Sequence, residues 1–168
     1  MRGVLGMALA LGLALAACGT PDANFPSETV CPSPGAGGSS RANPGARPEQ
    51  AFVAVVRTGA LQIVEERERL REVYPTDTFF RREGFRPDFA AYADRTICLA
   101  RELRAMGAPN ERLASWKANV DAALDALIGH TEAGREAVRT RNVSEYRAWY
   151  RGVDARLEAV TAAANASP

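Results

Sequence analysis

Four stretches of the chain repeat their apolar residues every three to four positions, which is the period of an amphipathic α-helix. The first covers about residues 49–74 and ends before Pro75, and the second runs from near Pro87 to Gly107. A residue that precedes proline disfavours the helical conformation, and glycine commonly follows a helix, so these residues predict helix boundaries. The stripes predicted to face the core are Phe52, Val56, Ile63, Leu70 and Val73, and then Phe89, Ala93, Thr96, Leu99, Ala100 and Leu103.

The third stretch begins near Asn110 and keeps one phase to about residue 140, across Gly129 and Gly134. Each internal glycine costs a helix about 1 kcal/mol relative to alanine, so one long helix and two helices broken near these glycines both fit the pattern. The fourth stretch begins at Asn142, a residue type that caps helix N-termini. The corresponding stripes are Leu113, Trp116, Val120, Leu124, Leu127, Thr131, Gly134 and Val138, and then Tyr146, Trp149, Tyr150, Val153, Leu157 and Val160.

These helices predict the fold class. No stretch alternates apolar and polar residues as a strand does. Four amphipathic helices with short connections predict an all-α fold, an antiparallel bundle of about four helices over residues 49–165. Residues 18–48 differ, because six of the ten prolines and four glycines fall between residues 20 and 48 without any periodicity. This segment is predicted to be a flexible tether.

The N-terminus has the pattern of an export signal. Arg2 precedes an apolar run at residues 4–17, which is short of the roughly 20 residues that cross a bilayer as a helix. The run leads into Leu-Ala-Ala-Cys at residues 15–18, which closely resembles the lipobox of bacterial lipoproteins. The resemblance implies that residues 1–17 are a lipoprotein signal peptide and that Cys18 carries a diacylglycerol and an acyl chain such as palmitate. An ordinary signal peptide with a chance cysteine is the alternative.

The same resemblance implies a location. Two or three acyl chains on Cys18 hold a domain stably on a membrane, which is then its first partner. In lipoproteins of bacteria with two membranes, aspartate after the lipidated cysteine tends to retain the protein at the inner membrane. Gly19 stands at this position, so the outer membrane or the cell surface is favoured.

The two other cysteines form a candidate disulfide. With Cys18 assigned to lipid, Cys31 and Cys98 remain as one pair in an oxidising compartment. Cys98 falls nearly opposite the apolar stripe of its helix, where a thiol faces outward and the tether can reach it. A bridge across 98 − 31 = 67 residues would stabilise the fold by about 4 kcal/mol in the chain-entropy model. Two free thiols are the alternative.

The charged residues give little indication of a binding or catalytic site. The 21 basic and 20 acidic side chains nearly cancel, which argues against a nucleic-acid partner bound through a strong positive field. On the first helix, the acids Glu65, Glu66, Glu68 and Glu72 alternate with Arg67, Arg69 and Arg71, an arrangement typical of a solvated face laced with ion pairs. Glu66 and Lys117 nevertheless fall within or near apolar stripes, where long side chains either reach outward or pair across helices. A functional buried acid is the other interpretation of Glu66.

No catalytic, cofactor-binding or metal-binding residues are assigned. His130 is the only histidine, which excludes HExxH sites and multi-histidine metal centres, and it is expected to be structural and partly exposed. Ser115 and Ser144 lie in no nucleophile elbow. The chain is therefore not expected to be an enzyme or to carry a cofactor.

The loop from Pro75 to Pro87 is the candidate partner-binding loop. It holds three phenylalanines among three arginines: Phe79, Phe80, Arg81, Arg82, Phe85 and Arg86. The rings either cap the open end of the bundle or remain partly exposed beside the arginines, a composition enriched at interface hot spots.

The sequence thus favours a lipid-anchored, exported helical domain that acts without catalysis, by binding a protein or organising the cell envelope. The alternative is a carrier of a small apolar ligand or lipid, held between the helices by Trp116, Trp149, Tyr146 and Tyr150. Those aromatic residues also lie at core spacing, so plain packing explains them too.

Overall fold

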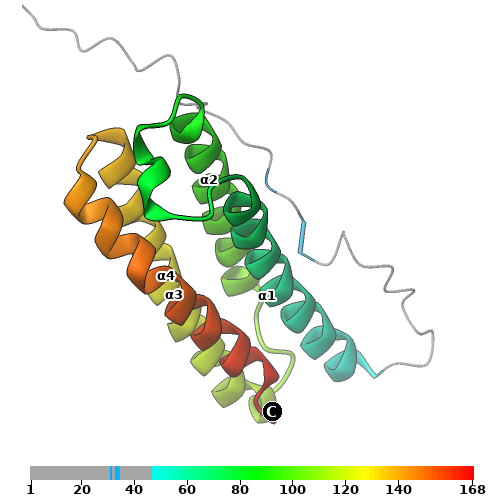
Figure 1. The fold of residues 1–168 in the computed structure, drawn as a ribbon. Coiled ribbons are helices and arrows are strands. Elements are labelled where there is room, and N and C mark those ends of the chain that lie inside the picture. Colours follow the sequence, from blue (N-terminus) through cyan, green and yellow to red (C-terminus); the bar gives the residue numbers. More distant parts are fainter. Residues whose placement is uncertain (1–30, 32, 35–46) are drawn as a thin grey trace, which may run out of the picture.

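The computed structural model describes Cys31, Ser33, Pro34 and residues 47–168. This part of the chain folds into four α-helices and a short 3-10 helix without a strand: α1 Pro48–Val73, η1 Asp77–Arg81, α2 Phe85–Ala105, α3 Glu111–Arg139 and α4 Val143–Asn165. Consecutive helices run in opposite directions and pack side by side (Figure 1). The prediction of an all-α antiparallel bundle is confirmed. None of these helices is long and apolar enough to span a membrane.

Most of the N-terminal predictions fall outside the described residues. This applies to the signal peptide at residues 1–17, to Cys18 and Gly19, and to the tether at residues 18–48 except for the few positions named above. They stay predictions.

The helices begin where local chemistry allows. Pro48 is the first residue of α1, a position at which its missing N–H group costs nothing. The predicted start of α2 near Pro87 is wrong by two residues, since the helix begins at Phe85 and holds Pro87 in its first turn, where proline is tolerated. Gly84 precedes it with a φ of 87°, a left-handed conformation that glycine adopts without strain. The side chain of Asn142 caps α4, as predicted.

The glycines of α3 do not break it. The helix is continuous from Glu111 to Arg139, so the one-helix interpretation is correct. Gly134 is needed for packing, because a Cβ atom there would lie 2.5 Å from Cδ1 of Trp149 on α4. This contact brings α3 and α4 close together, which offsets the low helix propensity of glycine.

The predicted stripes form the core, although Phe52 of α1 is only half-buried and one assignment is wrong. The stripe residues of α2, α3 and α4 are buried apart from Tyr150, which is half-buried. In α1 the assignment of Val73 is wrong, because its side chain is 54% exposed. Tyr74, the residue after the helix, turns inward instead and its ring packs edge-on against Phe85 at 5.0 Å between centroids.

Candidate functional site

The loop between α1 and α2 closes one end of the bundle. Phe85 is fully buried, and the half-buried ring of Phe80 lies 5.0 Å from the ring of Tyr146 and 6.2 Å from that of Phe85, between centroids. These contacts favour a cap over exposed rings for both phenylalanines. The side chains of Phe79 and Arg81 lie outside the described residues.

The arginines of this loop line a surface hollow of about 410 Å³. Its lining joins the loop to the α3–α4 connection: Phe80, Arg82, Glu83, Gly84, Arg86, Pro87 and Arg141. Arg86 is half-buried and donates a hydrogen bond from Nη2 to the carbonyl oxygen of Arg139 over 3.3 Å. Arg141 is exposed and has a φ of 58°, a left-handed conformation uncommon outside glycine and asparagine. With three arginines and one glutamate, the lining of the hollow is predominantly positive.

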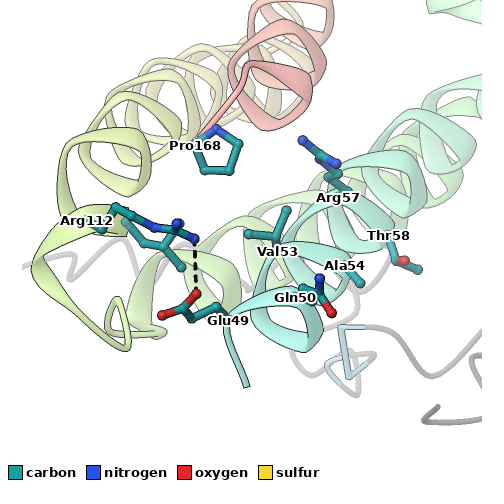
Figure 2. Close-up of a pocket in the computed structure, with 9 residues that line it drawn as sticks. Glu49, Gln50, Val53, Ala54, Arg57, Thr58, Arg112 and Pro168 are labelled. Carbon is teal, nitrogen blue, oxygen red and sulfur yellow. Dashed lines mark hydrogen bonds and ion pairs between the residues drawn. The ribbon is translucent and has the colours of Figure 1, made fainter. Parts of the chain in front are cut away.

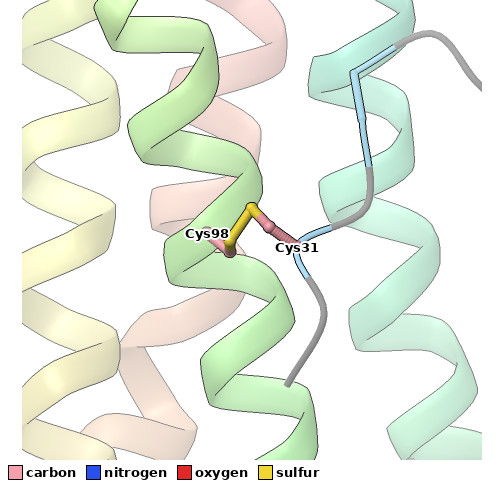
Figure 3. The surroundings of a disulfide bond; sticks show 2 residues. All are labelled: Cys31 and Cys98. Atoms are coloured by element: carbon pink, nitrogen blue, oxygen red, sulfur yellow. A yellow bond between two sulfur atoms is a disulfide. The ribbon is translucent and has the colours of Figure 1, made fainter. Parts of the chain in front are cut away.

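The predicted cysteine pair is brought together. Cys31 and Cys98 lie at disulfide distance, with their Cα atoms 5.5 Å apart (Figure 3). Cys98 lies on the outer side of α2, where the helical phase placed it, and is only partly buried. The pairing attaches the segment that precedes the bundle to the flank of α2.

The charge predicted inside the stripe of α1 is paired across helices. Glu66 is 4% exposed, and its carboxylate accepts hydrogen bonds from Arg69 one turn later and from Nε of Arg95 on α2, the latter at 2.7 Å. Lys117 is equally buried and donates to Asp121 at 2.6 Å and to a backbone carbonyl at 3.3 Å. Both charges are thus satisfied, which supports a structural role.

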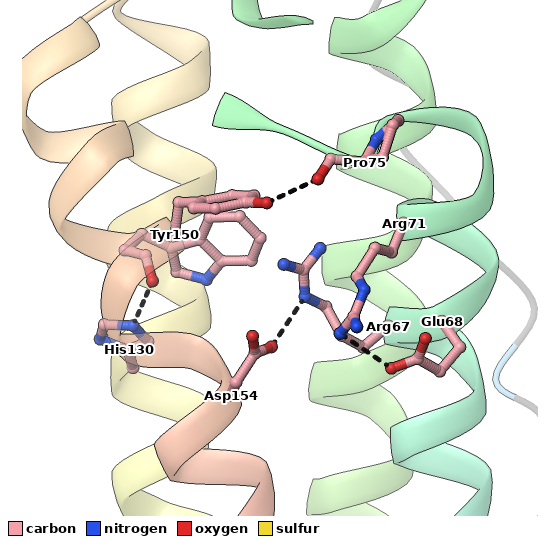
Figure 4. Close-up of polar contacts among 8 residues, drawn as sticks. Arg67, Glu68, Arg71, Pro75, His130, Tyr150 and Asp154 are labelled. Carbon is pink, nitrogen blue, oxygen red and sulfur yellow. Dashed lines mark hydrogen bonds and ion pairs between the residues drawn. The ribbon is translucent and has the colours of Figure 1, made fainter. Parts of the chain in front are cut away.

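Arg67 is a buried charge, and the prediction that it lies on a solvated face is wrong. The residue is 1% exposed, and its side chain points from α1 towards α4 (Figure 4). Its Nε donates to Oδ1 of Asp154 over 3.3 Å, and its Cζ lies 5.4 Å and 5.2 Å from the ring centroids of Trp149 and Tyr150. The signal was available, because Arg67 lies four residues after Ile63 and three before Leu70, both of which are buried.

Several buried donors accompany Arg67. Its Nη2, the hydroxyl of Tyr92 and the indole nitrogen of Trp149 are fully buried without a hydrogen-bond partner among the described residues. Burial raises the pKa of Tyr92, and the nearby Arg67 charge and Thr96 hydroxyl oppose this shift. An unsatisfied buried donor costs about 1–3 kcal/mol, so this cluster is unusual for a stable core.

His130 is structural, as expected. Its Nε2 lies 2.9 Å from the carbonyl oxygen of Trp149, and its imidazole ring packs against Gly152 of α4. Within the part of the chain that the structure describes, no group of three or more histidine, cysteine or acidic side chains is arranged to hold a metal ion.

A second hollow, of about 450 Å³, lies at the other end of the bundle between the start of α1 and the start of α3 (Figure 2). The carboxylate of Glu49 receives a bond from Arg112 at 3.0 Å and one from the side-chain amide of Asn110 at 2.5 Å. Arg57 donates from Nε to the carbonyl oxygen of Ala164 over 3.0 Å, near the end of α4. These polar groups connect helix ends, which is a structural function.

The aromatic residues considered for a ligand carrier pack on one another. Tyr146 and Trp149 stack at 5.6 Å between ring centroids, and both are almost fully buried. Trp116 contacts Phe52 edge-on at 6.1 Å. The hydroxyl of Tyr150 donates to the carbonyl oxygen of Pro75 over 2.8 Å (Figure 4). This packing favours the core interpretation of these side chains.

No protein-family model matches this chain, and no curated protein or solved structure shows significant similarity to it.

Proposed function

We propose that this chain is an exported lipoprotein, anchored through lipid on Cys18, whose helical domain acts by binding a protein partner in the cell envelope. The observation that carries the proposal is the Cys31–Cys98 pair, because a disulfide between a preceding segment and an outer helix face is typical of an oxidising, extracytoplasmic compartment. The lipobox at residues 15–18 supplies the anchor.

The anchoring step is tested by Cys18→Ser in cells that also receive a radiolabelled fatty acid. We expect the wild type to take up label and to lie in the membrane fraction, and the variant to appear unlabelled in the soluble exported fraction. Cys31→Ser is the matched control, since it removes another cysteine of the same segment and should leave label and membrane association unchanged. A wild type that takes up no label, together with a Cys18→Ser variant that stays on the membrane, would exclude a lipoprotein.

The binding surface that fits this function is the arginine-lined hollow. Arg82 and Arg141 are exposed there and come from two different connections, so a partner's acidic group can contact both. Phe80 belongs to the cap, and its truncation is expected to lower stability rather than binding alone.

Site-specific photo-crosslinking in the envelope tests this surface. A photoreactive residue at Arg82 or Arg141 should yield a discrete protein adduct, whereas the same residue at Arg101, which is exposed on the flank of α2, should yield none. An Arg82→Ala, Arg141→Ala double variant should weaken binding of the adduct partner by about 2 kcal/mol with an unchanged melting temperature. Equal crosslinking at Arg82, Arg141 and Arg101 would show that the hollow is not the specific interface.

A further inference from the structure

The guanidinium of Arg67 lies inside the bundle with part of its hydrogen-bonding capacity unused. Nε binds Asp154, whereas Nη2 is fully buried and has no hydrogen-bond partner in the described part of the chain. The side chain of Asp154 is 60% exposed, so water competes for its carboxylate. Arg67 therefore retains positive charge and an unused donor in a region of low dielectric constant.

Two more unused donors lie in the same part of the bundle. They are the hydroxyl of Tyr92 on α2 and the indole N–H of Trp149 on α4. The ring centroids of Tyr92 and Trp149 are 5.9 Å apart, and the Arg67 guanidinium packs over the Trp149 ring. Buried donors from α1, α2 and α4 thus lie in one part of the core, next to the Arg67 guanidinium, and together they are termed the Arg67 layer.

Both acids next to Arg67 in the sequence are already occupied, and Glu68 pairs with Arg71. Glu66 faces the opposite seam, where Arg69 and Arg95 bind its carboxylate. A guanidinium nitrogen and an indole N–H can only donate, and a hydroxyl can do so as well. The group that satisfies this layer is therefore an acceptor, and a negative charge on it would balance Arg67.

We propose that this layer binds a small monovalent anion of halide size, held by Nη2 of Arg67 together with the Tyr92 hydroxyl and the Trp149 indole. A halide accepts hydrogen bonds from several directions at once and offers no donor of its own, which matches a set of donors. Arg67, Tyr92 and Trp149 are each at most 2% exposed, which favours a monatomic ion over a larger oxyanion. The anion would be a constituent of the folded domain, independently of its anchor and its protein partner.

Bromide is the probe, since it resembles chloride and scatters anomalously. Crystals of the full chain grown in sodium bromide should show an anomalous peak within hydrogen-bonding distance of Nη2 of Arg67. In solution, replacing sodium gluconate by sodium bromide at constant ionic strength should raise the melting temperature until the site saturates, because the ion binds only the folded state.

Substitutions test whether the rise in melting temperature with bromide depends on these donors. Arg67→Met keeps a long unbranched side chain but removes the guanidinium, and it should abolish the bromide response, whereas Arg101→Met, at an arginine 63% exposed, should retain it. Tyr92→Phe deletes one donor hydroxyl and should weaken the apparent bromide affinity about tenfold. Tyr150→Phe, which loses a hydroxyl outside the donor set, should respond like the wild type. If Arg67→Met does not fold, the comparison of Tyr92→Phe with Tyr150→Phe tests the proposal by itself.

Any of three results would overturn the proposal. The first is an Arg67 layer occupied by ordinary water, with no anomalous signal in bromide crystals. The second is an equal melting temperature in gluconate and bromide at matched ionic strength. The third is a bromide response that Tyr92→Phe leaves unchanged.

Discussion

Helix α1 packs against α2 along one seam and against α4 along another, and the two seams bury neighbouring charges in different ways. At the α1–α2 seam, the carboxylate of Glu66 is buried, but its arginine partners extend towards solvent, Arg69 with a side chain 57% exposed and Arg95 with one 34% exposed. At the α1–α4 seam, Arg67 is itself enclosed and its carboxylate partner Asp154 is the exposed member. One seam satisfies its buried charge with ions, and the other surrounds it with aromatic rings.

The difference shows that burial and pairing are separate properties of a charged residue. A buried carboxylate with two cationic partners has its lone pairs occupied and serves as a link between helices. A buried guanidinium that packs on rings fills volume and makes cation–π contacts, and it needs less from its carboxylate. Each seam therefore predicts a different response to substitution.

The largest effect is expected for Arg67→Ala. Truncation removes a long, fully buried side chain from between Trp149 and Tyr150 and leaves a cavity, so the free energy of unfolding should fall by about 3 kcal/mol. Urea denaturation measures it. Arg67→Met, which fills the volume, should lose less than about 1 kcal/mol without halide, and an equal loss in both variants would show that the charge matters more than packing.

Glu66→Gln should cost less, about 2 kcal/mol. The substitution preserves shape but removes the negative charge between Arg69 and Arg95, which can still be hydrated because both are partly exposed. Glu68→Gln is the control, since Glu68 is exposed on the same helix and should cost less than about 0.5 kcal/mol. Identical midpoints for both variants would contradict the assignment of Glu66 as the link between α1 and α2.

The α1–α2 seam also contains a tyrosine with an altered titration. The hydroxyl of Tyr74 donates to Asp88 over 2.6 Å, and burial, followed by this hydrogen bond and the negative charge of Asp88, raises its pKa to about 12. The folded state then holds the proton more tightly than the unfolded chain, in which tyrosine titrates near pH 10. This contribution to stability is complete below about pH 10 and is lost as the pH rises towards 12.

Tyr74→Phe isolates that contribution. At pH 8 the variant should be about 1 kcal/mol less stable than the wild type, because the bond to Asp88 is gone. Between pH 10 and 12 the wild type should lose stability faster than the variant, so that the gap between them narrows. Paired chemical denaturation curves across this range measure the gap, and a constant gap would mean that Tyr74 titrates normally.

The smallest effect is expected for Lys117→Met. Lys117 is a buried cation like Arg67, but it packs beside its partner Asp121 on the same helix rather than between rings. Asp121 is 31% exposed and remains hydrated without Lys117. The free energy of unfolding should therefore stay the same or rise by less than about 1 kcal/mol, and the melting temperature should follow it. A clear fall would place Lys117 with Glu66, as a charge the fold requires.

The sequence predicted the helices well and the interior charges only in part. Apolar periodicity placed the four helices because each buries a single stripe, and Glu66 was recognised since it interrupts that stripe between Ile63 and Leu70. The prediction for Arg67 is wrong, although this residue is adjacent to the same stripe, because alternation with glutamates is not specific to a solvated face. A helix that packs against two neighbours buries a wider face than one stripe describes.

The arginine-lined hollow was beyond sequence reasoning for a different reason. Its lining combines residues 80–87 with Arg141, more than fifty positions later, and that proximity exists only once α2, α3 and α4 have packed. The loop was singled out by composition, which correctly marked it as unusual. Composition does not say which of its side chains turn inward, and Phe85 is completely buried.

The Cys31–Cys98 bond also sets the mechanics of the proposed anchor. Without it, the chain from Cys18 to Pro48 has 30 residue steps and reaches at most about 100 Å, whereas with it the 13 steps from Cys18 to Cys31 reach at most about 45 Å. The longest helix of the bundle, α3, measures about 44 Å, so under the proposed lipid anchor the oxidised domain would stay within about one of its own lengths of the membrane. A force on the proposed anchor would then reach the domain through the flank of α2 rather than through the start of α1.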